Sequence, residues 1–223
     1  MRLRLHRLSC DMRFEKGIDE KYQRSIEDAF ATILAKGNNH HKAVIGAILE
    51  SQLLVRVRPV SEVNASGVTG VINPVMTNIR LKRERMSLID ALGEIYITIA
   101  KETIDTGGQQ GCEGTFVHEG QHAYDFAQTL ESLSNADMNP LGVFNPTLYE
   151  MELAAHKSAG DYMLCIDREP YLDEGLQLMI LCREDGKCEV DPTGIDRRLR
   201  ESYGLELNGN QGSLATEMMG IVV

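Results

Sequence analysis

The chain has 223 residues, of which 43% are hydrophobic and 25% are charged, and its formal net charge is −10 at pH 7. This length and composition are those of a globular protein with a substantial core. The negative charge argues against a nucleic-acid partner and gives no support to binding at an anionic membrane surface, and no apolar run approaches the length of a membrane span.

Residues 1–8 alternate basic and apolar side chains. This alternation is typical of a strand with one buried face, and it differs from the continuous apolar stretch of a secretory signal peptide. The chain has five cysteines, and without a signal segment we expect free thiols in a cytoplasmic, reducing compartment. Secretion by a route that uses no N-terminal signal stays open.

Helices come first in the N-terminal half, and strands follow. Apolar residues at helical spacing predict amphipathic helices over 19–36 and 39–50. Alternating apolar residues predict strands, with one short helical segment among them and a flexible loop after them. The strands are expected over 52–60, 68–71, 76–83 and 93–101, the short helix over 87–92, and the loop over 106–112.

The stretch 115–124 contains His118-Glu119-x-x-His122 within a run that predicts a helix. Two histidines four residues apart project from one helix face about 40° from each other, so both imidazoles can reach one metal ion. Glu119 points about 100° away from His118 and can lie beside the metal as a base without being a ligand. Apolar residues at helical spacing form a separate, core-facing stripe, namely Phe116, Gly120, Ala123, Ala127 and Leu130.

These residue types suit zinc chemistry. Neutral imidazole binds Zn²⁺ at roughly 2.0–2.1 Å, and a site with three protein ligands keeps a fourth position for water. Zn²⁺ lowers the pKa of that water to roughly 7, so a nearby carboxylate can take its proton and direct hydroxide at a carbonyl group. The motif therefore predicts metal-assisted amide hydrolysis.

The residues around the motif resemble the extended signature of the zincin metallopeptidases. Thr115 lies three residues before the first histidine and Tyr124 lies two after the second. The residues around the motif, Phe116, Gly120, Gln121 and Ala123 among them, are uncharged and include no proline. The longer continuation found in the metzincins is missing, because Asp125 and Gln128 occupy its places. A third ligand must come from elsewhere, and two solvated histidines on an ordinary helix stay the alternative.

The segment after Asn145-Pro146 predicts a helix with Asn145 as N-cap and Pro146 at its first position. Its apolar face consists of Leu148, Met151, Ala155, Ala159 and Tyr162. Glu152 lies within this face, whereas Glu150 points to the polar side and is expected in solvent. A buried carboxylate is costly unless it is paired or bound to a metal, so Glu152 is the better candidate for the third ligand.

A glutamate on a later helix resembles the third ligand of the gluzincins, and the resemblance covers residues 115–162. It implies a Zn²⁺ site, and it also implies that the strand before the motif, 93–101, lies at the cleft edge and pairs with an extended substrate. The place four residues after the ligand, which is Asp in some members, is His156 here. His156 can orient a ligand, donate to a developing oxyanion, bind the metal or be structural. Tyr149 and Tyr162 are further candidates for the oxyanion donor.

The C-terminal part is predicted to be mainly helical. Residues 171–181 are ambiguous between helix and strand, Cys182 and Cys188 flank a predicted hairpin, and 193–203 predicts a helix. The Gly-rich tail from Asn208 is expected to be either disordered or docked. Together these elements predict one α+β, zincin-like domain over 1–223, with a cleft between an N-terminal lobe of about 1–133 and a C-terminal lobe of about 134–223.

The leading functional prediction is a zinc-dependent metallopeptidase that hydrolyses peptide bonds by a zinc-bound water. Its expected metal ligands are His118, His122 and Glu152, with Glu119 as the base and with His156 and Tyr162 as further catalytic residues. The expected partner is a peptide or protein substrate, with no nucleic acid or membrane, and the sequence does not indicate an oligomeric state. The alternatives are a catalytically inert zincin-like binding module and a zinc hydrolase of small amides or esters.

Overall fold

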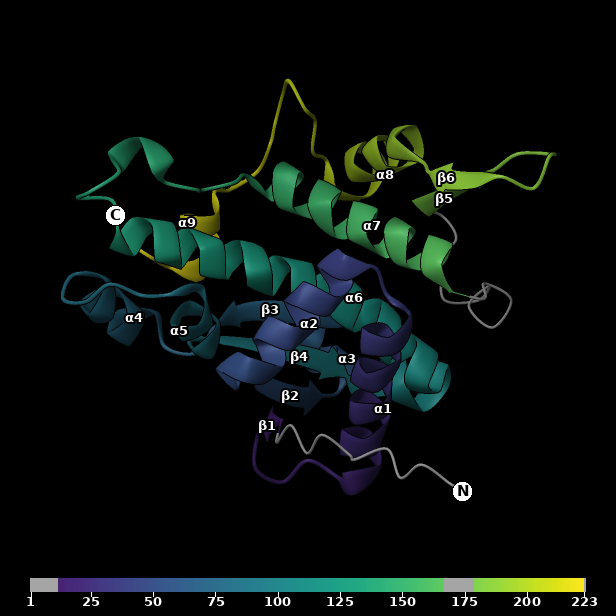
Figure 1. Ribbon diagram of the computed structural model, residues 1–223, viewed down its shortest axis with the longest axis horizontal. Coiled ribbons are helices and arrows are strands. Elements are labelled where there is room, and N and C mark those ends of the chain that lie inside the picture. The colour runs from purple at the N-terminus through teal and green to yellow at the C-terminus, as the bar shows by residue number, and fades with distance from the viewer. Residues whose placement is uncertain (1–11, 167–178, 223) are drawn as a thin grey trace.

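The computed structural model describes residues 12–166 and 179–222. The strand predicted over 1–8 and most of the ambiguous stretch 171–181 lie outside the described residues. A small mixed sheet and many helices make up the described part, which confirms the α+β class. Figure 1 shows the long helix α6 between the sheet and helix α7. No helix in the described part of the chain is long and apolar enough to cross a membrane.

The two predicted N-terminal helices are confirmed as α1 (Glu20–Lys36) and α2 (Asn39–Ser51). Each begins at a polar cap: the side chain of Asp19 accepts a hydrogen bond from the backbone of Lys21, and Asn38 accepts one from the backbone of His41. The ring of Phe30 on α1 packs edge-on against Phe116 of α6, with the ring centroids 4.7 Å apart. This contact sets α1 against the helix that carries the motif.

The main sheet has the strand order β1-β2-β4-β3. Strands β1 (Arg13–Phe14), β2 (Leu54–Arg58) and β4 (Ile95–Ala100) run parallel, and β3 (Gly67–Val71) pairs antiparallel with β4. The strands predicted over 52–60, 68–71 and 93–101 are therefore confirmed.

The position of β4 in the sheet differs from the expectation. Ile95, Ile97 and Ile99 are fully buried, and β4 has a paired strand on each side. The expectation that 93–101 lies at the cleft edge is wrong, because the strand that follows β2 in sequence, β3, adds to the far side of β4. The outer strand on this side of the sheet is β3.

The strand predicted over 76–83 is wrong, because this segment forms helix α4 (Pro74–Leu81). The side chain of Asn73 accepts a hydrogen bond from the backbone of Met76, and Pro74 occupies the first helical turn. This start signal outweighs the alternation of apolar residues that predicted a strand. The short helix expected over 87–92 is confirmed as α5 (Leu88–Gly93), and a single turn, α3 (Val60–Val63), follows β2.

The flexible loop predicted over 106–112 is also wrong, because these residues belong to α6 (Lys101–Ser134). The helix is broken only at Gly108, where φ is 55° and ψ is −136°, a conformation that glycine adopts readily. Directly after the break, the side-chain amide of Gln109 donates to Thr32 Oγ1 at 2.7 Å and to Glu113 Oε1 at 2.9 Å. The glycines thus mark a kink in a packed helix.

Helix α7 (Leu148–Cys165) begins two residues later than the sequence predicts. Its N-cap is Thr147, whose hydroxyl accepts a hydrogen bond from the backbone of Glu150, while the Glu150 carboxylate accepts one from the backbone of Thr147. Glu150 therefore holds the start of the helix. The predicted cap, Asn145, instead donates to Thr216 Oγ1 at 3.1 Å, and a short 3-10 turn (Pro140–Gly142) precedes it.

The C-terminal part packs on α7. The predicted hairpin is confirmed as β5 (Ile180–Cys182) and β6 (Cys188–Val190), and a disulfide joins Cys182 to Cys188, so the expectation of free thiols is wrong for this pair. The helix predicted over 193–203 is confirmed as α8 (Pro192–Tyr203).

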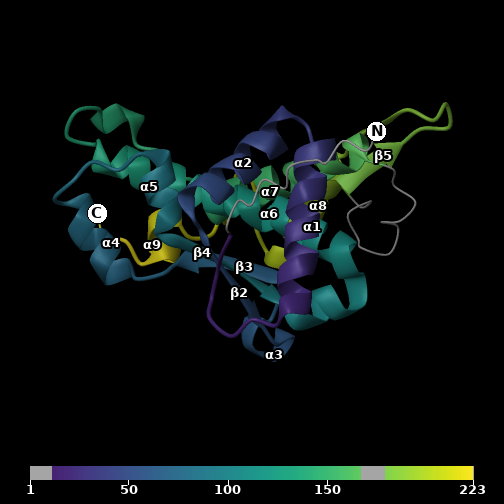
Figure 2. The same cartoon turned by 60° about the horizontal axis from the view of Figure 1, so that its bottom comes forward.

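The tail is docked through α9 (Ala215–Met219). In Figures 1 and 2, α9 lies near α4, and the backbone of Val222 donates to Asn78 Oδ1 at 2.9 Å. The tail thus returns to the N-terminal half of the chain and contacts α4.

Candidate active site

Helix α6 presents the two histidines of the motif on one face. Their Nε2 atoms are 3.1 Å apart, and the rings are nearly perpendicular, with 85° between their planes. His122 is buried, whereas His118 reaches the wall of a pocket. The four-residue spacing therefore brings both ring nitrogens to one point, as helical geometry requires.

Helix α7 brings Glu152 to the same point. Its Oε2 atom is 3.4 Å from His118 Nε2, and its Oε1 atom is 3.4 Å from His122 Nε2. In a tetrahedral site with bonds of roughly 2.0–2.1 Å, neighbouring ligand atoms are about 3.3 Å apart. The three side chains that the sequence predicts as ligands are thus brought together at separations that fit one Zn²⁺ ion.

Two buried atoms of this cluster lack hydrogen-bond partners among the described residues, Glu152 Oε2 and His156 Nε2. Buried polar atoms are ordinarily satisfied, so such a pair needs an explanation, and a cation between them would provide one. His156 Nε2 is 3.7 Å from Glu152 Oε2, farther than either motif histidine. His118, Glu152 and His156 also form a group that could hold a metal ion, so His156 remains an additional candidate ligand.

The ionisation of these residues suits a cation site. Burial opposes ionisation of Glu152, but the facing imidazoles of His118 and His122 outweigh it and hold the pKa of this carboxyl well below its usual range. Burial, and then the nearby His118, lower the pKa of His156 to about 4. At neutral pH the cluster therefore offers a carboxylate and a neutral imidazole, which are the forms that bind metals.

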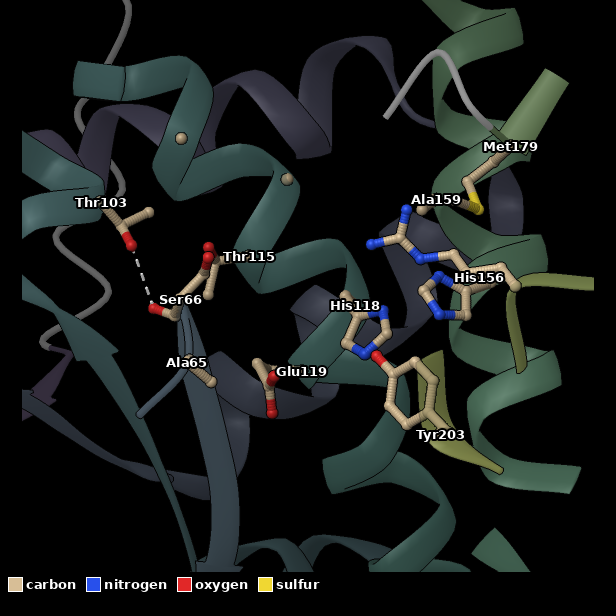
Figure 3. A pocket seen from close by; sticks show the side chains of 14 residues that line it. Ala65, Ser66, Thr103, Thr115, His118, Glu119, His156, Ala159, Met179 and Tyr203 are labelled. Carbon is tan, nitrogen blue, oxygen red and sulfur yellow. Dashed lines mark hydrogen bonds between the residues drawn. The ribbon is translucent and has the colours of Figure 1, made fainter. Parts of the chain in front are cut away.

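Glu119 is held beside the cluster by the outer strand β3. The hydroxyl of Thr69 donates to Glu119 Oε2 at 2.7 Å and also lies 3.1 Å from the backbone oxygen of Glu119. Figure 3 shows Glu119 between Ala65 and His118, along the same wall of the pocket. Its carboxylate is thus fixed next to the candidate metal site without belonging to the ligand group.

The strand and the motif helix approach very closely at Gly67. A Cβ atom on this residue would lie 2.6 Å from Thr115 Cγ2 and 2.9 Å from Glu119 Cγ, distances that real Cβ contacts do not reach. Only glycine fits between β3 and α6 here. Strand β3 therefore packs closely against α6 at Gly67, and its Thr69 hydroxyl fixes the carboxylate of Glu119.

A pocket of about 250 Å³ opens over the cluster. Its walls come from five places in the chain: the residues before and at the start of β3, helices α6, α7 and α8, and the residue before β5. They include Ala65, Ser66, Gly67, Thr103, Gly111, Gly114, Thr115, His118, Glu119, His156, Ala159, Met179, Arg198 and Tyr203. On one rim, Thr103 donates to the backbone oxygen of Ser66 at 3.2 Å (Figure 3).

Two of the residues that line the pocket, Arg198 and Tyr203, are not among the site residues that the sequence predicts. Both come from α8, whose amphipathic pattern predicts a helix but contains no spacing that points to chemistry. Tyr203 lies beside His156, with the ring centroids 6.1 Å apart, and Figure 3 shows its hydroxyl turned towards His118. Burial, and then the charge of Glu152, raise the pKa of Tyr203, so its hydroxyl stays protonated at neutral pH.

The tyrosines chosen from sequence lie elsewhere. Tyr162 is fully buried and donates a short hydrogen bond to Glu113, and its ring packs against His41 at 5.5 Å between centroids. Tyr149 donates to Asp196 Oδ1 at 2.9 Å. The prediction that Tyr162 faces the reacting group is therefore corrected, because its hydroxyl points into the core between α6 and α7. Of these tyrosines, Tyr203 is the one that lines the pocket.

Behind the histidines, a line of polar groups runs along α6. His40 Nε2 lies 2.6 Å from Gln121 Oε1, and the Gln121 amide donates to Asp125 Oδ1 at 2.9 Å. Asp125 is three residues from His122, and its other oxygen is buried without a hydrogen-bond partner among the described residues. Burial raises the pKa of Asp125 to about 6.

Comparison of the chain with protein-family models, with curated proteins and with solved structures found no match. The case for a function therefore comes from the residues of the pocket and from the motif.

Proposed function

We propose that this chain is a zinc-dependent metallopeptidase whose metal is held by His118, His122 and Glu152, as in the gluzincins that its motif resembles. The observation that carries the proposal is the triangle of donor atoms from α6 and α7, with separations of 3.1 to 3.4 Å. A zincin-like fold is part of the proposal. It is supported by the contact of the motif helix with a mixed sheet whose antiparallel outer strand reaches the pocket.

When bound, a zinc ion lowers the pKa of a water molecule to roughly 7 and polarises a carbonyl group. The side chains of the pocket supply the other roles. Glu119, oriented by the hydroxyl of Thr69, accepts the proton of the attacking water and returns it to the leaving amine. The Tyr203 hydroxyl, which stays protonated, donates a hydrogen bond to the oxygen on which negative charge develops.

The outer strand β3 is the proposed docking edge for an extended substrate. Among the described strands it pairs only with β4, so its other edge can accept the backbone of a peptide. Ala65, Ser66 and Gly67, at the start of this strand, line the pocket. This assignment replaces 93–101, which lies in the centre of the sheet.

A hydrolase of small amides or esters is the second candidate. The volume of the pocket, about 250 Å³, lies below the roughly 300–1,000 Å³ of typical small-molecule sites, which favours a short substrate. An inert binding module is less well supported, because a hydrogen bond from Thr69 holds the Glu119 carboxylate in place. Rates of cleavage of a peptide library and of simple amides and esters by the same preparation would separate the two enzymes.

The first test replaces the base. We expect Glu119→Gln to lower hydrolysis by about 10²–10⁴-fold while zinc stays bound, because glutamine can still accept the hydrogen bond from Thr69. Metal content is measured by mass spectrometry on the same sample. Full activity in this variant would remove Glu119 from the mechanism.

The second test concerns the third ligand and has a matched control on the same helix. Glu152→Gln should lose zinc, whereas Glu150→Gln, two residues away at the helix cap, should keep it. Anomalous scattering at the zinc edge from a crystal of the unaltered protein would identify every ligand directly. Zinc bound at another place, or equal zinc loss in both variants, would contradict the proposed site.

A further inference from the structure

Among the described residues that line the pocket, Arg198 is the one lysine or arginine. Its Nε atom is buried without a hydrogen-bond partner in the described part of the chain, and no ion pair joins its guanidinium to a described residue. The neighbouring arginine two residues later, Arg200, does pair, with Asp196 at 2.9 Å. Arg198 therefore differs from its neighbour: it lines the pocket, and none of the described residues forms an ion pair with it.

A guanidinium has five N–H donors in a planar fork, and buried donors are rarely left unsatisfied. The surroundings of Arg198 are partly apolar, because Ala159 and Met179 line the same pocket. Ala159 belongs to α7, and Met179 lies against the same helix, because a Cβ on Gly160 would lie 2.9 Å from the backbone oxygen of Met179. In such surroundings a cation gains more from an anionic partner than it does in water.

The charges of the residues that line the pocket also favour an anionic partner for Arg198. Glu119 and Glu152 together balance a divalent ion, and this leaves Arg198 as the excess positive charge. Its charge acts on both His156 and Tyr203, which places it beside the proposed reaction centre. An anionic group on the substrate would complete the balance, although the chain as a whole carries a net charge of −10.

We propose that Arg198 binds a carboxylate group of the substrate, so that the enzyme cleaves peptide bonds close to a free C-terminus or to an acidic side chain. The planar fork of arginine matches a carboxylate in a bidentate pair. The small volume of the pocket requires this carboxylate to lie within a short distance of the cleaved bond. The inference rests on the proposed peptidase function, since it names the substrate class of that site.

The test measures binding and cleavage of four short acetylated peptides. They are acetyl-Ala-Ala-Ala as the free acid, the same peptide as the C-terminal amide, and two amides with Glu or Gln at the central position. Binding is measured by calorimetry on zinc-loaded Glu119→Gln protein, and cleavage is measured on the unaltered protein. We expect the carboxylate-bearing peptide to be favoured over its neutral counterpart by about 10- to 100-fold.

Variants at α8 test whether Arg198 causes this preference. Arg198→Gln should abolish it, Arg198→Lys should keep part of it because charge remains without the fork, and Arg197→Gln, at an exposed neighbouring position, should keep all of it. Circular dichroism and zinc content check that each variant is folded. If the free acid is favoured, the carboxylate is a C-terminus, and if the Glu amide is favoured, it is a side chain.

The outcomes separate this inference from the peptidase proposal. Arg198-dependent binding without any cleavage would contradict the peptidase and support Arg198 as a carboxylate site. Cleavage with equal preference for charged and neutral peptides, or a preference unchanged in Arg198→Gln, would overturn the role of Arg198 and leave the peptidase standing. A uniform fall in kcat for all four peptides would assign Arg198 to the oxyanion and would also overturn the inference. Binding of none of the peptides would overturn it too.

Discussion

Two buried polar clusters lie between α6 and α7, and they differ in how their atoms are satisfied. In the first, Glu113 accepts hydrogen bonds from Tyr162 and Gln109, and His41 Nε2 lies 2.9 Å from the backbone oxygen of Ser158. In the second, which comprises His118, His122, Glu152 and His156, two buried atoms have no hydrogen-bond partner among the described residues. Burial alone therefore does not identify a site, but buried donors and acceptors without partners point to a ligand.

The largest expected effect comes from removing a ligand. His122→Ala should weaken zinc binding by well over 100-fold, since even residues that only orient a ligand change metal affinity by about 10–100-fold. Hydrolysis should fall with it. Zinc titration with a chromophoric chelator measures the affinity. Retention of zinc at unaltered affinity would show that His122 is structural, like His41 in the first cluster.

A smaller loss is expected at the proposed oxyanion donor. Tyr203→Phe should lower kcat by about 10²–10³-fold, as for the loss of one such donor in other hydrolases, without loss of zinc. Tyr149→Phe, at a position on α7 that does not line the pocket and whose hydroxyl pairs with Asp196 of α8, should leave kcat unaltered. Equal rates for the two variants would mean that Tyr203 does not touch the reacting oxygen.

Asp125 combines features of both clusters: its Oδ1 atom accepts a hydrogen bond from Gln121, and its Oδ2 atom has no partner in the part of the chain that the structure describes. Burial raises its pKa to about 6, whereas an aspartate in an unfolded chain has a pKa of roughly 3.9. The folded protein thus keeps a proton that the unfolded chain has lost. The contribution of Asp125 to stability should therefore fall as pH rises from about 4 to about 6, by up to about 3 kcal/mol. The lowered pKa of His156 acts in the opposite direction over the same range.

Urea unfolding of chelator-treated protein across this pH range measures the effect, because zinc binding has a pH dependence of its own. Compared with the unaltered protein, Asp125→Asn should gain stability as pH rises from about 4 to about 6. The difference for Asp161→Asn, the same change at an exposed position on α7, should not depend on pH. A stability difference for Asp125→Asn that stays constant across this range would contradict the raised pKa of Asp125.

The smallest effect is expected in the satisfied cluster, and it should appear in stability alone. Tyr162→Phe removes the hydroxyl that donates to the buried Glu113 carboxylate, which should cost about 1–3 kcal/mol of unfolding free energy. Zinc content and kcat should stay unaltered. A loss of activity in folded Tyr162→Phe would return this residue to the catalytic group and weaken the contrast between the clusters.

Local patterns were enough to predict that His118, His122 and Glu152 come together. The spacing of His118 and His122 is a property of one helix, and Glu152 stands out because it interrupts an apolar face. Tyr203 and Arg198 could not be found in this way, since α8 meets α7 only through tertiary packing. Tyr162 was chosen because it shares a face with Glu152, and the sequence contains nothing that reveals Glu113 as its partner.

The fold, too, could be predicted from local patterns only where tertiary packing does not decide the structure. Helices with clear caps, such as α1 and α8, were predicted, but the place of β4 in the sheet depends on pairing between distant segments. Asn73 and Pro74 start helix α4, although the alternating apolar residues after them predicted a strand. Asn145 and Pro146 predicted the start of α7, but that helix begins two residues later, at Leu148. The glycines near Gly108 predicted a loop, but this segment is helical and packs against α1. The local sequence does not reveal this contact.

The position of the proposed catalytic base, Glu119, depends on Gly67. The position of Glu119 is controlled by a residue that has no side chain, so a single added methyl group would press on Thr115 and Glu119 together. Gly67→Ala would thus alter catalysis without removing any chemical group from the pocket. Substitutions that probe the proposed substrate pocket should accordingly leave position 67 untouched and vary the wall to which α8 contributes its side chains.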